Sequence, residues 1–155
     1  MALALFAFIA WVIITVFCLI PKRLLIEENI TLFFIYNIIV INIYTILDLD
    51  LKLITPNNET DMFISLWLHR NIIIPLSLII FVNLVINSTT RIRKSFTSVV
   101  AFLILYFIEV LTLWVNIKTY SGWNLYLTAV TMTALMLVAF MIMKLITKLP
   151  ERKLI

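Results

Sequence analysis

The stretch Phe102–Trp114 reads FLILYFIEVLTLW and places one carboxylate, Glu109, inside an apolar run that is long enough to cross a lipid bilayer. The whole run covers 96–117, which matches the roughly 20 residues that a transmembrane helix needs. An ionised side chain in the hydrocarbon is costly unless it is paired, protonated or hydrated. Glu109 therefore predicts a membrane-spanning helix and a polar partner elsewhere in the chain.

The composition indicates the same class of protein. Of the 155 residues, 64% are hydrophobic and 13% are charged, so the chain cannot present a polar surface to water on all sides. The length accommodates five spans and leaves little for a soluble catalytic domain. We predict an all-α integral membrane protein in which residues 1–155 form one domain, a compact bundle of five transmembrane helices.

Five continuous apolar runs give the predicted spans, which are 2–20, 30–47, 62–86, 96–117 and 123–146. The runs do not alternate with a period of two, which excludes a β-barrel. The first run is interpreted as a span and not as a signal peptide, because its basic residues follow it. The third run leaves two alternatives open. Its helix begins near Met62, or a short interfacial helix precedes a span that begins near Ile72.

The distribution of Lys and Arg predicts the orientation. Nine of the twelve lie in the first loop, the third loop and the tail: Lys22, Arg23, Arg91, Arg93, Lys94, Lys144, Lys148, Arg152 and Lys153. The other three, Lys52, Arg70 and Lys118, lie in the second and fourth loops. The positive-inside rule then places the N-terminus outside and the C-terminus in the cytoplasm.

Polar and aromatic residues near the outer ends of the spans are expected at the outer interface. An aromatic belt is predicted from Tyr44, Trp67, Trp114, Tyr120, Trp123 and Tyr126. His69 is interpreted as a polar anchor at this interface. Asn124, at the start of the fifth span, is expected at the same interface.

Polar residues at helical spacing around Glu109 predict a buried cluster. Tyr106, Glu109 and Thr112 recur at intervals of three residues, so they share one helix face. Polar residues at comparable depth on the second, third and fifth spans are assigned to the same cluster. Its predicted members are Arg70, Glu109, Tyr106, Thr112, Asn116, Asn42, Thr128 and Thr131.

Arg70 is the predicted partner of Glu109. If the third helix begins near Met62, Arg70 lies about 12 Å below the outer edge, level with Glu109. The guanidinium would then pair with the carboxylate. If the helix begins near Ile72, Arg70 reaches the headgroups and Glu109 is protonated or hydrated. In either case, Pro75 has no N–H to donate and frees a carbonyl near Asn71, which we expect the buried cluster to satisfy.

Several functional classes lack their motifs. The single cysteine, Cys18, excludes an intramolecular disulfide, and the single glycine, Gly122, excludes a P-loop and a dinucleotide fingerprint. We expect no metal and no cofactor, because no second histidine lies at ligand spacing from His69. The net charge of +4 is spread over membrane-proximal loops, so nucleic acid is not an expected partner.

Two segments carry a resemblance. FISLWLHRNIIIPLSLIIFVNLVI (63–86) and ILYFIEVLTLWVNIKTYSGWNLYLT (104–128) resemble uncharacterised small multispan membrane proteins of spore-forming Gram-positive bacteria. The similarity covers Met62 to Met143 and lies in the spacing of Arg70, Pro75 and Glu109. It implies a multi-pass protein of the bacterial cytoplasmic membrane and implies no reaction.

Three functions remain open. The expected one is a structural or interaction role, as an accessory subunit of a membrane complex, with the bilayer and either a membrane protein or further copies of the chain as partners. The alternative is a small proton- or ion-coupled carrier that uses Glu109, although such carriers usually break their helices at Gly or Pro. The third is a lipid-acting membrane enzyme, which lacks a nucleophile or a pair of carboxylates in this sequence.

Overall fold

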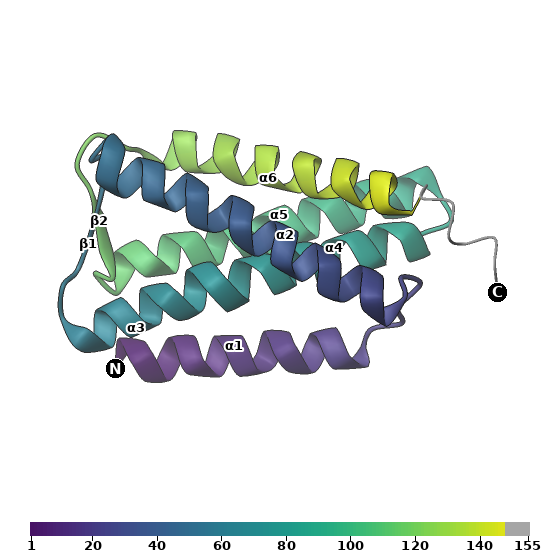
Figure 1. Cartoon of the computed structure of the whole chain (residues 1–155), viewed down its shortest axis with the longest axis horizontal. Coiled ribbons are helices and arrows are strands. Elements are labelled where there is room, and N and C mark those ends of the chain that lie inside the picture. Colours follow the sequence, from purple (N-terminus) through teal and green to yellow (C-terminus); the bar gives the residue numbers. More distant parts are fainter. Residues whose placement is uncertain (148–155) are drawn as a thin grey trace.

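A computed structural model describes residues 1–147 as a bundle of helices closed at one end by a short ribbon of two strands (Figure 1). Its elements are α1 (Ala2–Leu19), α2 (Ile26–Thr45), η1 (Ile46–Asp50), β1 (Ile54–Pro56), α3 (Thr60–Leu68), η2 (His69–Ile73), α4 (Ile74–Asn87), α5 (Arg91–Trp114), β2 (Lys118–Tyr120) and α6 (Leu125–Ile146). The elements η1 and η2 are wide, π-helical turns that continue α2 and join α3 to α4. Among the described residues, five helices are long and apolar enough to cross a membrane. The predicted tail cations Lys148, Arg152 and Lys153 lie outside the described residues.

The third helix is continuous from Thr60 to Asn87 and forms the centre of the bundle. Its α4 part packs against α1, α2, α5 and α6. In its most apolar 18-residue window 56% of the residues are buried, compared with 22 to 28% in the other four helices. Of the two alternatives left open for the third run, the structure has the single helix, which begins at Thr60, close to Met62.

Capping side chains explain why several helices begin away from the predicted boundaries. α2 begins at Ile26 because the Glu28 carboxylate accepts a hydrogen bond from the N–H of Leu25, at 2.8 Å. α5 begins at Arg91, because Thr90 accepts from the N–H of Arg93, at 3.3 Å. The predicted basic third loop is therefore partly the first turn of α5. Asn124 caps α6 in the same way.

Two helices end in residues with a left-handed backbone. After α5, Asn116 has φ 58°, and the N–H groups of Asn116 and Ile117 donate to the carbonyls of Leu113 and Thr112, at 3.0 and 2.9 Å. This pair of bonds defines a Schellman motif, in which Asn is the common alternative to Gly. Lys52, after η1, has φ 51°. Each helix therefore ends at this turn, and an extended segment follows it.

These extended segments are β1 and β2, which pair antiparallel with Ile54 opposite Tyr120 and Pro56 opposite Lys118. The pairing continues on both sides through Asn57 N–H to the Ile117 carbonyl and Ser121 N–H to the Leu53 carbonyl, both at 2.9 Å. The all-α prediction missed this ribbon. We call the end of the bundle that holds β1 and β2 the ribbon end; the N-terminus lies there as well (Figure 1).

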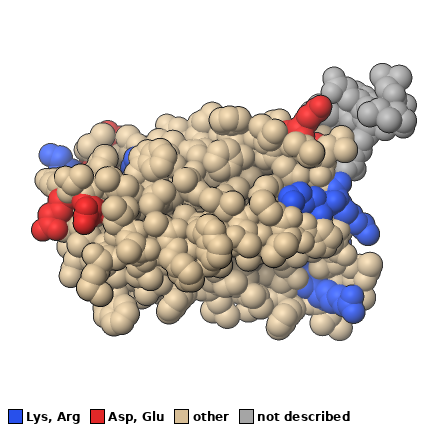
Figure 2. All heavy atoms as spheres, turned by 90° about the horizontal axis from the view of Figure 1, so that it is seen from below, with Lys and Arg blue, Asp and Glu red and all other residues tan. Residues whose placement is uncertain are grey.

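Charged side chains gather at the two ends of the molecule, and the long face shown in Figure 2 is almost free of them. At the ribbon end the exposed charged residues are Asp50, Lys52, Glu59 and Asp61. At the opposite end they are Lys22, Arg23, Glu27, Arg91, Arg93, Lys94 and Lys144. An apolar middle between two charged ends is the surface expected of a bundle that crosses a membrane.

Polar side chains connect the helices inside the bundle. The amide of Asn37 in α2 donates to the Asn71 carbonyl at 2.7 Å, and this carbonyl is the one left free by Pro75. The predicted cluster was expected to satisfy this backbone, and the structure corrects this, because the donor is Asn37, which was not assigned to the cluster. Towards the opposite end, the Tyr36 hydroxyl donates to the Ala139 carbonyl at 2.7 Å, and the Asn83 amide donates to the Asn29 side chain at 2.8 Å.

The bond from Asn37 to Asn71 predicts a measurable stability loss. Replacing Asn37 with Ala leaves the Asn71 carbonyl without its donor, so the free energy of unfolding in mixed detergent micelles should fall by about 1 to 3 kcal/mol. Asn42→Ala is the matched control, because the Asn42 amide is exposed and donates within its own helix, to the Ile38 carbonyl. Pro75→Ala restores an N–H and should reduce the cost of Asn37→Ala. Equal losses in the wild-type and Pro75→Ala backgrounds would contradict this account.

Candidate functional site

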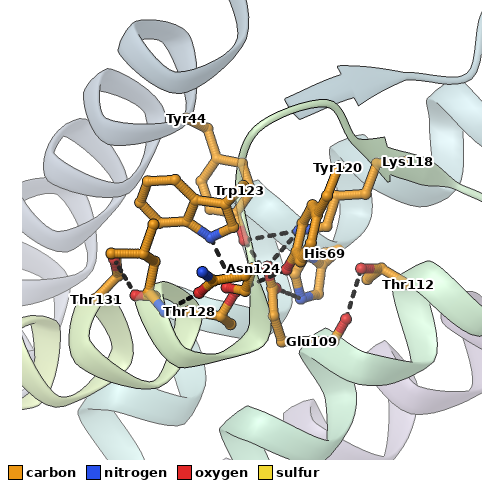
Figure 3. A network of polar contacts seen from close by, with 11 residues as sticks. Tyr44, His69, Glu109, Thr112, Lys118, Tyr120, Trp123, Asn124, Thr128 and Thr131 are labelled. Atoms are coloured by element: carbon orange, nitrogen blue, oxygen red, sulfur yellow. Dashed lines mark hydrogen bonds and ion pairs between the residues drawn. The ribbon is translucent and has the colours of Figure 1, made fainter. Parts of the chain in front are cut away.

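The carboxylate of Glu109 in α5 is the centre of a buried polar cluster at the ribbon end (Figure 3). Its Oε1 forms an ion pair with Nζ of Lys118 in β2. Its Oε2 accepts a hydrogen bond from the Tyr44 hydroxyl at 2.8 Å and lies 3.3 Å from Nε2 of His69. Glu109 is 3% exposed and Lys118 is 1% exposed. We call these four residues the Glu109 cluster.

The structure corrects the predicted pair of Arg70 and Glu109. Among the described residues, Glu109 forms its ion pair with Lys118 and lies 3.3 Å from Nε2 of His69, and Arg70 forms no ion pair. The third helix does begin near Met62, at Thr60, which is the alternative that the pairing required. The rotation of the helix about its own axis could not be estimated from the residue count. Adjacent residues of a helix point about 100° apart, so this rotation decides whether residue 69 or residue 70 faces the carboxylate. As a result His69 faces the carboxylate, and Arg70 lies half-buried against another part of the ribbon end.

Lys118 reaches the interior because the chain reverses direction directly before it. The left-handed turn at Asn116 and the pairing of β2 with β1 direct the chain back across the bundle end. The ammonium group then lies 4.8 Å from the ring centre of Tyr44 and 5.9 Å from that of Tyr120. Cation–π contacts of this kind help to compensate a desolvated charge.

His69 lies inside the bundle and not at the outer interface where the sequence placed it. Its ring is 1% exposed and meets Phe6 of α1 and Tyr44 of α2 edge to face, with ring centres 5.9 and 6.3 Å apart. Among the described residues neither Nδ1 nor Nε2 of His69 has a hydrogen-bond partner. With His69 in η2, the cluster and its contacts connect α1, α2, η2, α5 and β2.

A second polar group joins the ribbon to α6. The hydroxyl groups of Tyr120 and Thr128 are 2.8 Å apart, and the indole N–H of Trp123 donates to the Thr128 hydroxyl at 2.9 Å. Burial, assisted by the nearby charge of Glu109, raises the pKa of Tyr120 above its ordinary value. Tyr120 therefore keeps its proton and remains a hydrogen-bond donor over the physiological pH range.

The other predicted site residues lie around the cluster without joining the carboxylate. Thr112 and Thr131 donate to carbonyls of their own helices. Asn42 is exposed, and Asn116 ends α5, which corrects their assignment to the buried cluster. Tyr106 stacks on Phe102 with ring centres 5.8 Å apart.

Two further residues that were predicted at the outer interface lie in α3 and at the start of α6. Trp67 lies on the surface of α3 and is 48% exposed. Asn124 is the cap of α6.

The sequence analysis missed Lys118 and Tyr44 as partners of Glu109. Lys118 was interpreted as a loop cation and Tyr44 as part of the aromatic belt. The available signal was Asn116 directly after an apolar run, because Asn favours the left-handed turn that ends a helix and reverses the chain. The pairing itself depends on contacts between distant segments and has no local signature.

The space around the cluster is too small for a substrate. A void of about 10 Å³ adjoins Glu109, Tyr44 and Thr128. Grooves of about 320, 400 and 630 Å³ run along the sides of the bundle, and no residue of the Glu109 cluster lines them. Among residues 1–147 no group of three or more His, Cys, Asp or Glu side chains is placed to hold a metal ion. The arrangement holds the carboxylate of Glu109 in place between Lys118 and Tyr44.

The ion pair of Glu109 and Lys118 predicts strong coupling in a double-mutant cycle. Lys118→Met leaves a buried carboxylate without its cation, so stability in detergent should fall by about 3 to 5 kcal/mol. The double variant Lys118→Met/Glu109→Gln should recover a large part of that loss, since no charge then remains unpaired.

Arg70→Gln is the comparison variant for this cycle. It should cost less than about 1 kcal/mol in lipid-free detergent, and its effect should add to that of Glu109→Gln. Strong coupling of Glu109 to Arg70, together with weak coupling to Lys118, would contradict the pairing.

The chain matches no protein-family model, no curated protein and no solved structure with which it was compared. The resemblance to small multispan proteins of spore-forming bacteria therefore stays a prediction. The function has to be argued from the geometry of the Glu109 cluster and its surroundings.

Proposed function

We propose that this chain is a multi-pass protein of the bacterial cytoplasmic membrane with a structural or interaction role, as an accessory subunit of a membrane complex. The observation that carries the proposal is the state of Glu109. Its carboxylate is paired with Lys118, accepts a hydrogen bond from Tyr44 and adjoins a void of about 10 Å³. A charge compensated from several elements is suited to fixing how helices and ribbon pack.

The sides of the bundle support an interaction role. Large apolar side chains are exposed on each of the four outer helices, among them Trp11, Phe34, Phe107 and Leu137. Such surfaces suit lipid, and they equally suit the helices of another membrane protein, because interfaces between helices in the bilayer rest on close packing.

A proton-coupled carrier is the second candidate, and one observation favours it. His69 and Glu109, both titratable, lie 3.3 Å apart inside the bundle, and Nδ1 of His69 has no partner among the described residues. A carrier would also need a path from this pair to each side of the membrane. The enclosure of the pair weakens this candidate. An enzyme is less favoured, because the grooves large enough for a lipid chain lie away from His69 and Glu109.

Site-specific cross-linking in cells tests the interaction role. A photoreactive residue is placed at Trp11, Phe34, Phe107 or Leu137, one position on each outer helix. An accessory subunit should give a discrete cross-link to one other membrane protein from one or two of the four faces. No cross-link from any face, together with a strictly monomeric state in mild detergent, would exclude this role.

Proton flux separates the structural role from the carrier. Liposomes that contain the protein should show the same proton permeability as empty liposomes, and Glu109→Gln should not change it. A flux that the wild type supports and Glu109→Gln abolishes without loss of stability would establish the carrier instead.

The ribbon end is proposed to face outside. Among the described residues, Lys52 is the exposed cation of the ribbon end, whereas the opposite end exposes six, which are Lys22, Arg23, Arg91, Arg93, Lys94 and Lys144. Because Lys118 is buried, the ribbon end exposes one cation fewer than the sequence indicated, and the difference in exposed cations between the two ends is larger. The positive-inside rule then places the opposite end in the cytoplasm.

Cysteine labelling tests this orientation. In a Cys18→Ala background, Asn58→Cys in the segment between β1 and α3 should react with a membrane-impermeant maleimide added to intact cells, since Asn58 is exposed at the ribbon end. Thr89→Cys at the opposite end should react only after the membrane is permeabilised. The reverse labelling pattern would overturn the orientation.

A further inference from the structure

A second polar site lies at the ribbon end, separate from the Glu109 cluster. A pocket of about 170 Å³ lies between the end of α2 with η1 on one side and α3 with the start of η2 on the other, and Pro56 of β1 also lines it. Asp48 and Arg70 both line this pocket, together with Trp67 and Phe63. No residue of the Glu109 cluster lines it.

Arg70 provides an uncompensated positive charge in this pocket. Its Nε is buried and has no hydrogen-bond partner, and among residues 1–147 no carboxylate oxygen lies within 4.0 Å of its guanidinium. A half-buried cation without an anion is costly in the outer part of a bundle. The planar fork of donors matches a phosphate or carboxylate group, which it can bind through two parallel hydrogen bonds.

The carboxylate of Asp48 limits which charged groups a ligand of this pocket can carry. Because this carboxylate lines the same pocket, a purely anionic ligand would meet a like charge, and a purely cationic one would meet Arg70. A ligand with an anionic group and an ammonium group close together complements both. A primary ammonium suits Asp48 better than a quaternary one, since it can donate hydrogen bonds to the carboxylate.

The neighbouring side chains indicate that this ligand is part of a lipid. Trp67 and Phe63 line the pocket and are 48% and 56% exposed, and the adjacent Leu49 is 66% exposed. An apolar rim of this kind favours a ligand that continues into acyl chains, and Trp is enriched at the membrane interface. Arg70 lies about 15 Å along the helix from Thr60, within reach of the headgroup region for a long side chain.

We propose that this pocket binds the headgroup of a phosphatidylethanolamine lipid, with the phosphate on Arg70 and the ammonium on Asp48. The site concerns a lipid ligand and does not depend on the proposed structural role. It also gives the guanidinium of Arg70 an anion at hydrogen-bond distance, since no carboxylate of the described residues lies within 4.0 Å of it.

Lipid retention by the whole protein tests the proposal. The protein in mild detergent is mixed with phosphatidylethanolamine, phosphatidylcholine or phosphatidylglycerol of identical acyl chains, and bound lipid is counted by native mass spectrometry. Phosphatidylethanolamine should be retained roughly tenfold more tightly than phosphatidylcholine. The quaternary ammonium of choline has no N–H to donate to the Asp48 carboxylate.

Variants at the two charged positions should act differently. Arg70→Gln should reduce retention of all three lipids, since each carries the phosphate. Asp48→Asn should remove the preference for ethanolamine over choline and improve binding of phosphatidylglycerol. Arg93→Gln, an exposed cation at the opposite end, is the matched control and should change nothing at this site. Circular dichroism establishes that each variant keeps its helices.

Three results would overturn the proposal. The first is equal retention of ethanolamine and choline lipids by the wild type. The second is unchanged lipid retention in Arg70→Gln and Asp48→Asn variants that are folded. The third is displacement of the lipid by free phosphoethanolamine at equal concentration, because the site would then serve a soluble zwitterion and not a lipid.

Discussion

The ion pair between Glu109 and Lys118 is the interaction on which the ribbon end depends. Removing two charges from water costs several kcal/mol per ion, and their attraction offsets this only when additional hydrogen bonds complete the geometry. The Tyr44 hydroxyl supplies such a bond to the carboxylate, and the tyrosine rings beside Lys118 lie at cation–π distance. The two charges are nine residues apart in the chain. Their pairing therefore requires α5 to end and the chain to turn back within that short distance.

The ribbon provides that return. Backbone N–H and carbonyl groups need hydrogen-bond partners, and the segments that leave η1 and α5 provide them for each other as β1 and β2. A ribbon of two short strands has little stability alone. Here it is held by the ion pair through Lys118 and by the contact of Tyr120 with Thr128 on α6. The charge and the ribbon thus depend on each other, which explains why a single lysine in a connection is buried.

The five long apolar helices could be predicted because a run of apolar residues long enough for a bilayer has few other structures available to it. Their ends moved by a few residues, and each shift has a local cause, such as the caps at Thr90 and Asn124 or the Schellman motif at Asn116. The partner of Glu109 could not be predicted. Counting residues along a helix gives depth but not rotation, and rotation is fixed by packing between helices.

Lys118 shows a second limit of sequence analysis. A lysine after a span is normally an interfacial charge, and nothing in its immediate neighbours indicates burial. The turn residue Asn116 predicts that the chain reverses, and the apolar Ile117 is consistent with an inward course. The choice between interface and interior nevertheless depends on Tyr44 and His69, which lie 74 and 49 positions earlier in the chain. Such long-range contacts have no signature in a single sequence.

The wide turn η2 explains how one helix serves two polar sites. A π-helical turn changes the rotation of the residues that follow it, and such turns are frequent at functional sites. Here it holds His69 towards Glu109 while the next residue, Arg70, faces the pocket that contains Asp48. Pro75 removes a backbone donor just beyond this turn, and Asn37 satisfies the carbonyl that this exposes. Adjacent residues therefore belong to two different sites: His69 adjoins the enclosed ion pair of Glu109 and Lys118, whereas Arg70 lines a surface pocket and forms no ion pair among the described residues.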